Sequence, residues 1–558
     1  MIPEIFGLFQ KSLKEKTFMR NIHLDHFKAL RPTTMTSAAL VAILALTFYL
    51  RLLLFGQIID PDVGRASYLG WRMAEGEVLI DIEGPGKPPL YSMLYAVFIF
   101  LFGPSVMGLK MFGAVFVLMA VLAVYWVANQ AYRKKVGLLA ALLFGVFSSG
   151  PMVEGGTVNL ETVLHFPYIL AIGFFVKASE SRRLRWYFFA GLCAAMATLV
   201  KQVGGVLFFV FLCYGIHEWW RKKYPFSIKG WLYRYIVLAG GALLPVVGMI
   251  LFHQLHGYTL SEIYESMLAS NLSYIQRAHE YTSVLKYFSS SMKGILPENG
   301  LLWLGTMFAA AYLGRRSWSN RGQGNDRILL WWAFWSFAVL WVTGTFWAHY
   351  FLQIIAPFSI LAAFGIVAAW KLAKSLSPFP RFVGQSVWAI LLMIMVIFFV
   401  KTDYKYFFSY TPVEQTIFQY KGLNRSVEVY GLYNVVQQQI AYYIRDNTDP
   451  TDTIYVWGIA PQVYFLAQRK AATRYICNAN MSFLVTDDSL KALQAYAPTV
   501  MEEIRKSRPA YIVEIFPIEH FPELQTFVRD QYMVERSVEL PVGPYYKIHL
   551  YRRRHDFQ

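Results

Sequence analysis

The sequence predicts an α-helical polytopic membrane protein with a soluble α/β domain at its C-terminal end. Three observations support this fold class. The 558 residues are 56% hydrophobic and only 16% charged, with 44 Phe, 36 Tyr and 16 Trp. Apolar runs of roughly membrane-spanning length recur up to about residue 401. Beyond that point, short β-rich runs alternate with amphipathic helical patterns.

The membrane part contains eleven apolar runs that approach the length needed to cross the hydrocarbon layer. They are 36–55, 106–130, 137–151, 160–177, 186–201, 203–217, 235–252, 299–314, 328–347, 350–370 and 383–401. The first run is too long for a signal-peptide core, so we expect it to be retained as a span. A twelfth run, Pro88 to Phe102, is shorter.

The distribution of Lys and Arg decides whether this twelfth run crosses the membrane. If it does not cross, 25 Lys and Arg fall on the side of the N-terminus and 7 on the other side. If it crosses, 19 of those 25 change sides. Because basic loops stay in the cytoplasm, we expect an interfacial or re-entrant helix here, a cytoplasmic N-terminus and an outside C-terminus. The net charge of +17 then reflects these loops, which makes nucleic acid the weaker explanation.

The C-terminal part predicts strands at "DTIYVWG", "AATRYI", "PAYIVEIF" and "YYKIHLY". Helices are predicted at "YNVVQQQIAYYIRDNT", "SLKALQAYAPTVMEEIRKSR" and "FPELQTFVRDQY". We therefore predict two domains, a transmembrane domain at 1–401 and an extracytoplasmic α/β domain at 402–558.

The predicted topology brings acids, lysines and histidines to one outer rim. Asp60, Asp62 and Lys87 lie in the first outer loop, and Glu154 and Glu161 lie in the second. Lys201 lies at the outer end of the fifth span, and His349 also belongs to this rim. A carboxylate beside fixed cations suits group transfer from a phosphate ester, because the acid takes a proton and the cations hold the departing charge. Inversion at a sugar donor of this kind needs one carboxylate as base.

The first outer loop carries a motif with a known counterpart. The stretch "PDVGRASYLGWRMAEGEVLIDIEGPGKPPLY" resembles the first-loop signature of GT-C glycosyltransferases of the dolichyl-phosphate-mannose protein mannosyltransferase type, in the bacterial branch that includes the lipid A aminoarabinose transferases. The matching residues are Asp62, Gly64, Tyr68, Gly70, Gly76 and Lys87-Pro88-Pro89. "NLETVLHFP", "LVKQVGG", "HYFLQIIAP" and "YVWGIAPQVYFLAQRKAATRY" extend the resemblance through most of the chain.

The resemblance implies a GT-C fold with juxtamembrane helices and an inverting transfer of one sugar from a polyprenyl-phosphate donor. It implies catalytic roles for Asp62 and Glu161, and donor-phosphate binding by Lys87 and Lys201. Further candidates for substrate binding are Asp60, Tyr68, Gln202, Arg277 and His349. The signature's second acid is replaced by Val63 and its frequent acid before the lysine by Gly86. Acceptor and metal contacts therefore do not carry over from those two positions.

The expected setting is the bacterial inner membrane, with the site and the C-terminal domain on the periplasmic side. The acceptor is left open as a lipid, glycan or protein, and a divalent cation is left open as a cofactor. Three alternatives remain. The first is a lipid or sugar transporter, which would have ionisable residues within its spans and often two repeated halves of the chain. The second is a glycan ligase, which would need more cationic contacts than two lysines offer. The third is a non-catalytic scaffold.

Overall fold

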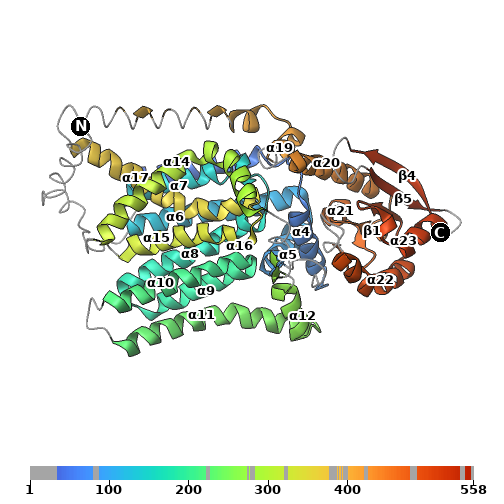
Figure 1. The fold of residues 1–558 in the computed structure, drawn as a ribbon, viewed down its shortest axis with the longest axis horizontal. Helices are drawn as coiled ribbons and strands as arrows, with labels where there is room; N and C mark the ends of the chain where they lie inside the picture. Colours follow the sequence, from blue (N-terminus) through green and yellow to red (C-terminus); the bar gives the residue numbers. More distant parts are fainter. Residues whose placement is uncertain are drawn as a thin grey trace.

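The computed structural model consists of a long helical bundle and a smaller C-terminal region with a β-sheet, arranged end to end along the longest axis (Figure 1). The structure describes residues 34–78, 87–221, 227–269, 271–272, 275–276, 283–318, 324–375, 386, 389–390, 393, 397, 400–401, 403–419, 425–477, 487–540 and 547–554.

The bundle is built from long helices that run side by side (Figure 1). They are α3 (Thr34–Leu52), α6 (Val106–Ala131), α7 (Lys134–Phe147), α8 (Leu160–Ser181), α9 (Leu184–Val200), α10 (Val206–Arg221), α11 (Ile228–Leu255), α14 (Val284–Trp318), α15 (Gly324–Ala338) and α17 (Leu352–Ser375). Within the described part of the chain, six helical segments are long and apolar enough to cross a membrane. The chain is therefore a membrane-embedded protein.

Small residues hold the helices of the bundle together. A Cβ atom added at Gly191 of α9 would lie 1.9 Å from the carbonyl oxygen of Leu238 on α11. A Cβ at Gly241 of α11 would lie 2.1 Å from the carbonyl oxygen of Phe188. Because lipid tails are as apolar as leucine, helices in a bilayer gain more from such close backbone approach than from hydrophobic burial. The α9–α11 pair uses this mode of packing.

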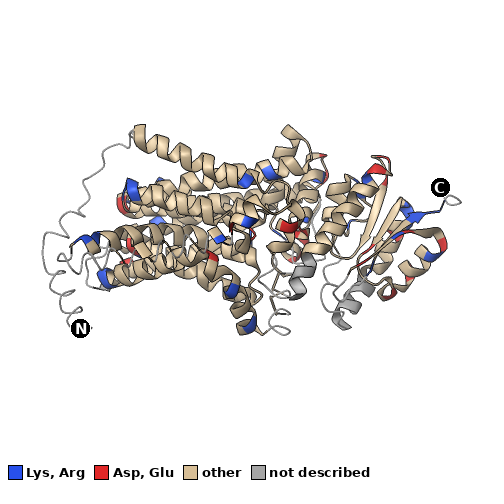
Figure 2. Ribbon diagram, turned by 90° about the horizontal axis from the view of Figure 1, so that it is seen from above, with Lys and Arg blue, Asp and Glu red and all other residues tan. Residues whose placement is uncertain are grey.

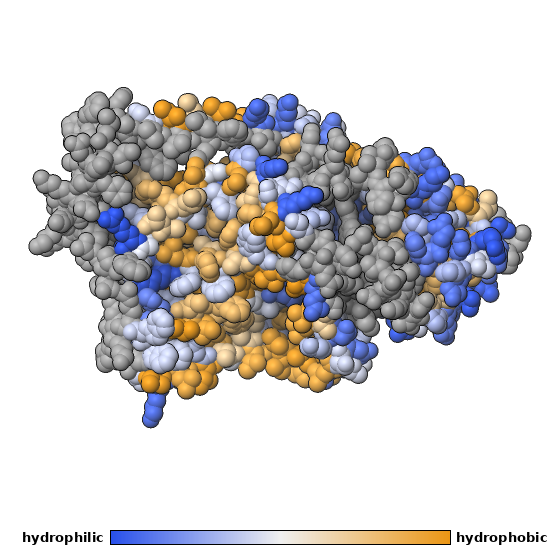
Figure 3. Space-filling model, viewed as in Figure 1, coloured by the Kyte–Doolittle hydropathy of each residue, from blue (hydrophilic) through white to orange (hydrophobic). Residues whose placement is uncertain are grey.

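The bundle is hydrophobic outside as well as inside. Only 17% of the most apolar window of α11 is buried, whereas 78% of the segment Ala348–Ser375 is buried at the centre. Figure 3 shows hydrophobic atoms along the lower edge of the bundle, where α11 runs. Figure 2 shows several Lys and Arg at the end of the bundle farthest from the C-terminal region. An apolar belt with basic residues at one end is typical of a protein that spans a membrane.

Two of the predicted spans differ from the structure, and a third cannot be compared with it. The predicted span 328–347 is interrupted, because α15 ends at Ala338 and the short α16 (Leu340–Thr343) is stopped by Gly344 at φ +67°. The predicted span 299–314 is only the second part of α14, which begins at Val284. The predicted span 383–401 lies mostly outside the described residues.

Two short helices, α4 (Pro61–Ala74) and α5 (Leu90–Phe102), lie at the end of the bundle that faces the C-terminal region (Figure 1). At 13 residues, α5 is too short to cross the hydrocarbon layer. It is apolar throughout and exposes Val97, Phe100, Leu101 and Phe102. The structure thus agrees with the interfacial helix that the distribution of Lys and Arg predicts for this run.

The C-terminal region contains one five-stranded sheet with the order β2-β1-β3-β5-β4. Its strands are β1 (Thr453–Trp457), β2 (Lys470–Ala471), β3 (Tyr511–Glu514), β4 (Tyr532–Glu539) and β5 (Lys547–Arg553). β1 pairs in parallel with β2 and β3, and β5 pairs antiparallel with β3 and β4. The helices of this region are α20 (Arg425–Asp446), α21 (Gln462–Ala467), α22 (Asp487–Ser507) and α23 (Pro522–Gln531). The short helix α19 (Pro412–Phe418) precedes α20 and bonds to the segment that follows α3, through the hydroxyl of Thr416 and the backbone N–H of Ile58.

Two features of this sheet correct the sequence prediction. The predicted strand "AATRYI" is wrong apart from Ala471, because the chain turns after it and the backbone N–H of Arg474 donates to Glu503 instead of to a strand. Strand β4 was missed. It lies at the sheet edge and exposes both Met533 and Val534, so it lacks the alternation that marks a half-buried strand.

The C-terminal region packs directly on α4 through α21. A Cβ atom at Gly64 of α4 would lie 2.2 Å from Cβ and 2.4 Å from Cα of Gln462, so the two backbones are in close contact. The hydroxyl of Tyr68 accepts a hydrogen bond of 2.8 Å from the backbone N–H of Ala471, and its ring lies 5.3 Å from that of Tyr464. The helix that carries Asp62 is therefore held between the bundle and the C-terminal region.

Candidate active site

The first side of the candidate site is the N-terminal turn of α4. Asp60 caps this helix, accepting a hydrogen bond of 2.8 Å from the backbone N–H of Val63, and Pro61 occupies the first helical position. This local sequence fixes Asp62 in the first turn. Lys87, which lies three residues before the start of α5, donates a hydrogen bond of 3.2 Å from Nζ to Oδ2 of Asp62. The Asp62 side chain keeps 42% exposure and remains accessible to a substrate.

The second side is formed by the start of α8 and the end of α9. Glu161 lies in the first turn of α8, where the helix dipole favours a negative charge. It is 1% exposed, and it forms an ion pair with Lys201 directly after α9. The ammonium of Lys201 also lies 4.3 Å from the ring centre of Tyr350. A buried lysine between a carboxylate and an aromatic face is held in one position.

A third ion pair joins the second outer loop to the segment before α17. Oε2 of Glu154 lies 2.9 Å from Nδ1 of His349, which belongs to the short helix η4 (Ala348–Phe351). Glu154 is 2% exposed. The side chain of Asn159 donates to the same carboxylate oxygen at 3.5 Å and to the hydroxyl of Thr157 at 2.7 Å.

These three pairs belong to one electrostatic cluster. Asp62 interacts with Lys87, His349 and Lys201. Lys87 interacts in turn with Glu161. Figure 2 shows acidic and basic residues in the otherwise uncharged ribbon where the bundle meets the C-terminal region.

The pKa values of the two acids at the start of α4 are shifted in opposite directions. Burial raises the pKa of Asp60 to about 7, and the neighbouring carboxylate of Asp62 adds to this rise. Partial burial opposes the ionisation of Asp62, but the cations of Lys87, His349 and Lys201 outweigh it and hold its pKa below the ordinary value. Burial also opposes the charge of Lys87, but Asp62 more than compensates and raises the lysine's pKa. Asp62 is therefore the ionised carboxylate that can accept a proton.

The other predicted substrate-binding residues lie in different places. Tyr68 is 2% exposed and contacts the C-terminal region. Gln202, next to Lys201, donates from its amide to the carbonyl oxygen of Met267 at 3.2 Å. Arg277 lies outside the described residues.

Two contacts of the cluster were missed by reasoning from the sequence. Glu154 was placed on the outer rim but was not predicted as the partner of His349, which follows it by 195 residues. Tyr350 was not singled out beside Lys201. No local spacing links these positions. The only signal for Glu154 is an acid before two glycines in an outer loop.

The described residues include no group of three His, Cys, Asp or Glu side chains that could hold a metal ion.

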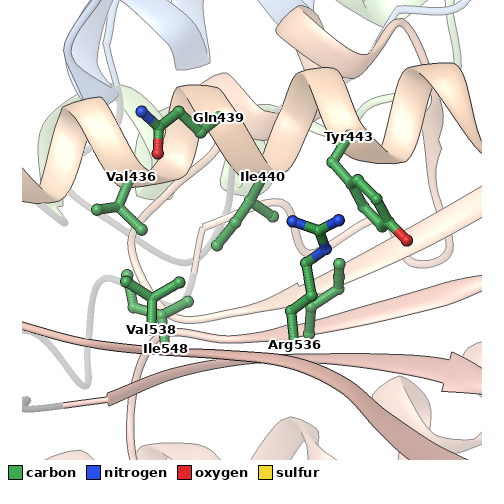
Figure 4. A pocket seen from close by; sticks show the side chains of 8 residues that line it. Val436, Gln439, Ile440, Tyr443, Arg536, Val538 and Ile548 are labelled. Carbon is green, nitrogen blue, oxygen red and sulfur yellow. The ribbon is translucent and has the colours of Figure 1, made fainter.

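A separate hollow lies in the C-terminal region between α20 and the strands β4 and β5 (Figure 4). It is lined mainly by aliphatic side chains, and the guanidinium of Arg536 lies 3.9 Å from the ring centre of Tyr443 at one end. Its volume of about 70 Å³ accommodates a few water molecules rather than a sugar or a lipid. None of the charged residues of the cluster lines it.

Comparisons with known proteins agree with this architecture. Residues 86–247 match the model of the dolichyl-phosphate-mannose-protein mannosyltransferase family. No curated protein sequence matches the chain significantly.

Several solved structures share the fold. ArnT from Cupriavidus metallidurans bound to undecaprenyl phosphate is 14% identical, with a TM-score of 0.56, and the match covers 93% of this chain and 98% of ArnT. The apo state of the same enzyme is 12% identical, with a TM-score of 0.53 and coverage of 92% and 97%. The oligosaccharyltransferase AglB from Archaeoglobus fulgidus, in complex with an inhibitory peptide and a dolichol-phosphate, is 14% identical, with a TM-score of 0.55 and coverage of 87% and 70%. The chain therefore has the fold of these ArnT and AglB structures, and its residues 86–247 are similar to the dolichyl-phosphate-mannose-protein mannosyltransferase family, in agreement with the GT-C resemblance of its sequence.

Proposed function

We propose that the chain is an inverting glycosyltransferase that moves one sugar from a polyprenyl-phosphate carrier to an acceptor outside the cytoplasm. The observation that carries this proposal is the contact of 3.2 Å between Asp62 and Lys87, with Lys201 and His349 acting on the same carboxylate. An ionised base next to fixed cations is what transfer from a phosphate ester requires.

In this mechanism, the carboxylate of Asp62 takes the proton from the acceptor's nucleophilic group. The freed electron pair forms a bond to the anomeric carbon of the sugar, and the bond from that carbon to the phosphate oxygen breaks on the opposite face. The carrier phosphate leaves with the bonding electrons, and Lys87 and Lys201 stabilise its negative charge. A phosphate is a good leaving group without a strong acid, so one base is sufficient and the configuration inverts.

Glu161 has a supporting role in this proposal. It is nearly inaccessible and is paired with Lys201, so it fixes the lysine that faces the phosphate. A direct contact of Glu161 with the acceptor or a cation remains the alternative role that the family resemblance implies.

A polyprenyl-phosphate donor is supported by the height of the site. The cluster lies at the end of the bundle, beside the juxtamembrane helices α4 and α5, where the head group of a lipid is found. Two proteins with the same fold were solved with lipid phosphates, undecaprenyl phosphate in ArnT and dolichol-phosphate in AglB. The Lys and Arg at the opposite end support a cytoplasmic N-terminus and an outer site in the bacterial inner membrane.

The direct test replaces the base and separates binding from turnover. Asp62→Asn keeps the shape of the side chain but removes its charge, so the glycosylated acceptor in the cell envelope should fall by about 10²- to 10⁴-fold. Binding of undecaprenyl phosphate to the purified full chain should survive. Asp530→Asn, at an exposed acid far along the chain, is the control and should leave both unchanged. Normal glycosylation by a properly inserted Asp62→Asn protein would refute the role of Asp62.

A further inference from the structure

The pair formed by Glu154 and His349 takes no part in the bond-making and bond-breaking steps above, although His349 acts on the carboxylate of Asp62 within the same cluster. Glu154 is buried, and its second carboxylate oxygen, Oε1, has no hydrogen-bond partner in the described part of the chain. An ionised or polar group in such a position costs free energy unless it serves an interaction. Nδ1 of His349 is the closest charged partner of this carboxylate, at 2.9 Å.

The backbone holds Glu154 in a conformation that side chains rarely adopt. Its φ of +52° lies in the left-handed region, which costs a non-glycine residue of the order of 1 kcal/mol or more. The two following glycines allow the loop to pack closely, since a Cβ at Gly155 would lie 2.5 Å from the carbonyl oxygen of Ser148 and a Cβ at Gly156 would lie 1.9 Å from the side-chain oxygen of Gln57. The strained backbone of this loop therefore places the carboxylate of Glu154 next to His349.

His349 is central to the charges of the site. It acts electrostatically on Asp62, on Asp60 and on Glu161, and it is the second cation after Lys87 in its effect on Asp62. The two lysines are already paired with carboxylates. Lys87 neutralises the charge of Asp62, and Lys201 neutralises the charge of Glu161. A phosphate that enters this cluster therefore gains from a further charged N–H donor beside the two lysines.

We propose that Glu154 and His349 form a carboxylate–imidazole pair that supplies the third cation for the phosphate of the lipid donor. This inference rests on the proposed function. A carboxylate hydrogen-bonded to one ring nitrogen orients an imidazole and stabilises its charged form. With Nδ1 donating to Glu154, the charged ring offers Nε2–H to the phosphate oxygen. His349 is thus a donor-binding residue, and Glu154 is a positioning residue that acts through it.

The test compares two lipids that differ only in their head group. Undecaprenyl phosphate and the neutral alcohol undecaprenol are titrated against the purified full chain in detergent. Glu154→Gln and His349→Gln should each weaken binding of undecaprenyl phosphate by about 10-fold and leave undecaprenol binding unchanged. The double variant should bind no more weakly than either single variant, because the two residues act as one unit. His349→Lys restores a positive charge and should recover most of the affinity.

His256→Gln is the matched control. His256 is exposed and directly follows α11, where its ring bonds to the carbonyl oxygen of Phe252. Both affinities should therefore stay at the wild-type value.

The outcomes separate this inference from the function on which it rests. If the wild-type protein binds undecaprenyl phosphate and both glutamine variants bind it equally well, the Glu154–His349 pair has no role in donor binding. Equal losses for undecaprenol and undecaprenyl phosphate would show a structural role and also overturn the inference. A wild-type protein that binds undecaprenyl phosphate no better than undecaprenol would overturn the proposed donor itself.

Discussion

Asp60 and Asp62 are two positions apart in the chain, but their surroundings give them different chemical roles. Asp60 is buried and caps α4, and burial raises its pKa to about 7. Asp62 is partly exposed and faces the cations that keep it ionised. When neighbouring carboxyl groups have pKa values that are pushed apart, the ionised one is the base. Both acids lie in one sequence motif, and only the structure shows that their environments differ.

The raised pKa of Asp60 predicts a specific dependence of stability on pH. The folded protein keeps the proton on Asp60 up to about pH 7, whereas the unfolded chain releases it near pH 4. The folded state therefore binds more protons in this window, and the contribution of Asp60 to stability is lost as the pH rises from about 4 to about 7. Asp60→Asn still caps the helix but does not titrate.

Thermal unfolding of the wild type and of Asp60→Asn in detergent, from pH 5 to pH 8, measures this effect. The variant should gain stability relative to the wild type as the pH rises, by more than about 1 kcal/mol, since one pKa unit corresponds to about 1.4 kcal/mol. A difference that is the same at every pH would show that Asp60 titrates normally in the folded protein.

The residues of the site differ in how far the sequence could predict them. Asp62 and Lys87 are 25 residues apart in one motif, so their proximity could be predicted. Glu161 and Lys201 could be placed on one rim because each lies at the end of an apolar run. The Glu154–His349 pair could not be predicted, because 195 residues separate its members and only the packing of the second outer loop against η4 joins them.

At the scale of elements, α4 depends on its contact with α21. Gly64 allows this contact, because any side chain there would overlap the backbone of Gln462. Gly64→Ala should displace α21 or α4, destabilise the protein by about 1–3 kcal/mol and lower turnover by shifting Asp62 relative to Lys87. Thermal unfolding and the amount of glycosylated acceptor in the envelope check these two effects.

Gly240→Ala is the matched control for this prediction. Gly240 lies in α11 and a Cβ there meets no atom within 4 Å, so the substitution should be neutral or slightly stabilising. Equal behaviour of the two variants would mean that the close contact between α4 and α21 does not matter for the site.

The elements of the membrane part could be predicted better than those of the C-terminal region. Long apolar runs identify the helices of the bundle. The basic loops predicted that the short run ending at Phe102 is interfacial, and the 13 residues of α5 agree with that prediction. The edge strand β4 has no alternating pattern, and the run "AATRYI" has β-forming residues without a strand to pair with beyond Ala471. Whether these two segments form strands depends on the strands available to pair with them, and not on local β propensity.

At the scale of the whole molecule, the C-terminal region packs against α4, the helix that carries Asp62. Its contacts reach residues about 400 positions away, such as Lys470 with Glu77 at 3.2 Å and Ala471 with Tyr68 at 2.8 Å. Such contacts leave no signature in a single sequence. The predicted boundary between the two domains near residue 401 stays a prediction, since many of the residues around it lie outside the described parts of the chain.

The central claim is that Asp62 drives transfer of a sugar from a lipid phosphate. The most direct measurement is mass spectrometry of lipid extracts from cells whose own copy of the protein carries Asp62→Asn. Because the variant still binds its donor but cannot use it, a polyprenyl phosphate bearing one sugar should accumulate as the glycosylated acceptor disappears. An unchanged pool of polyprenyl-phosphate sugars, with the acceptor still fully glycosylated, would contradict the account.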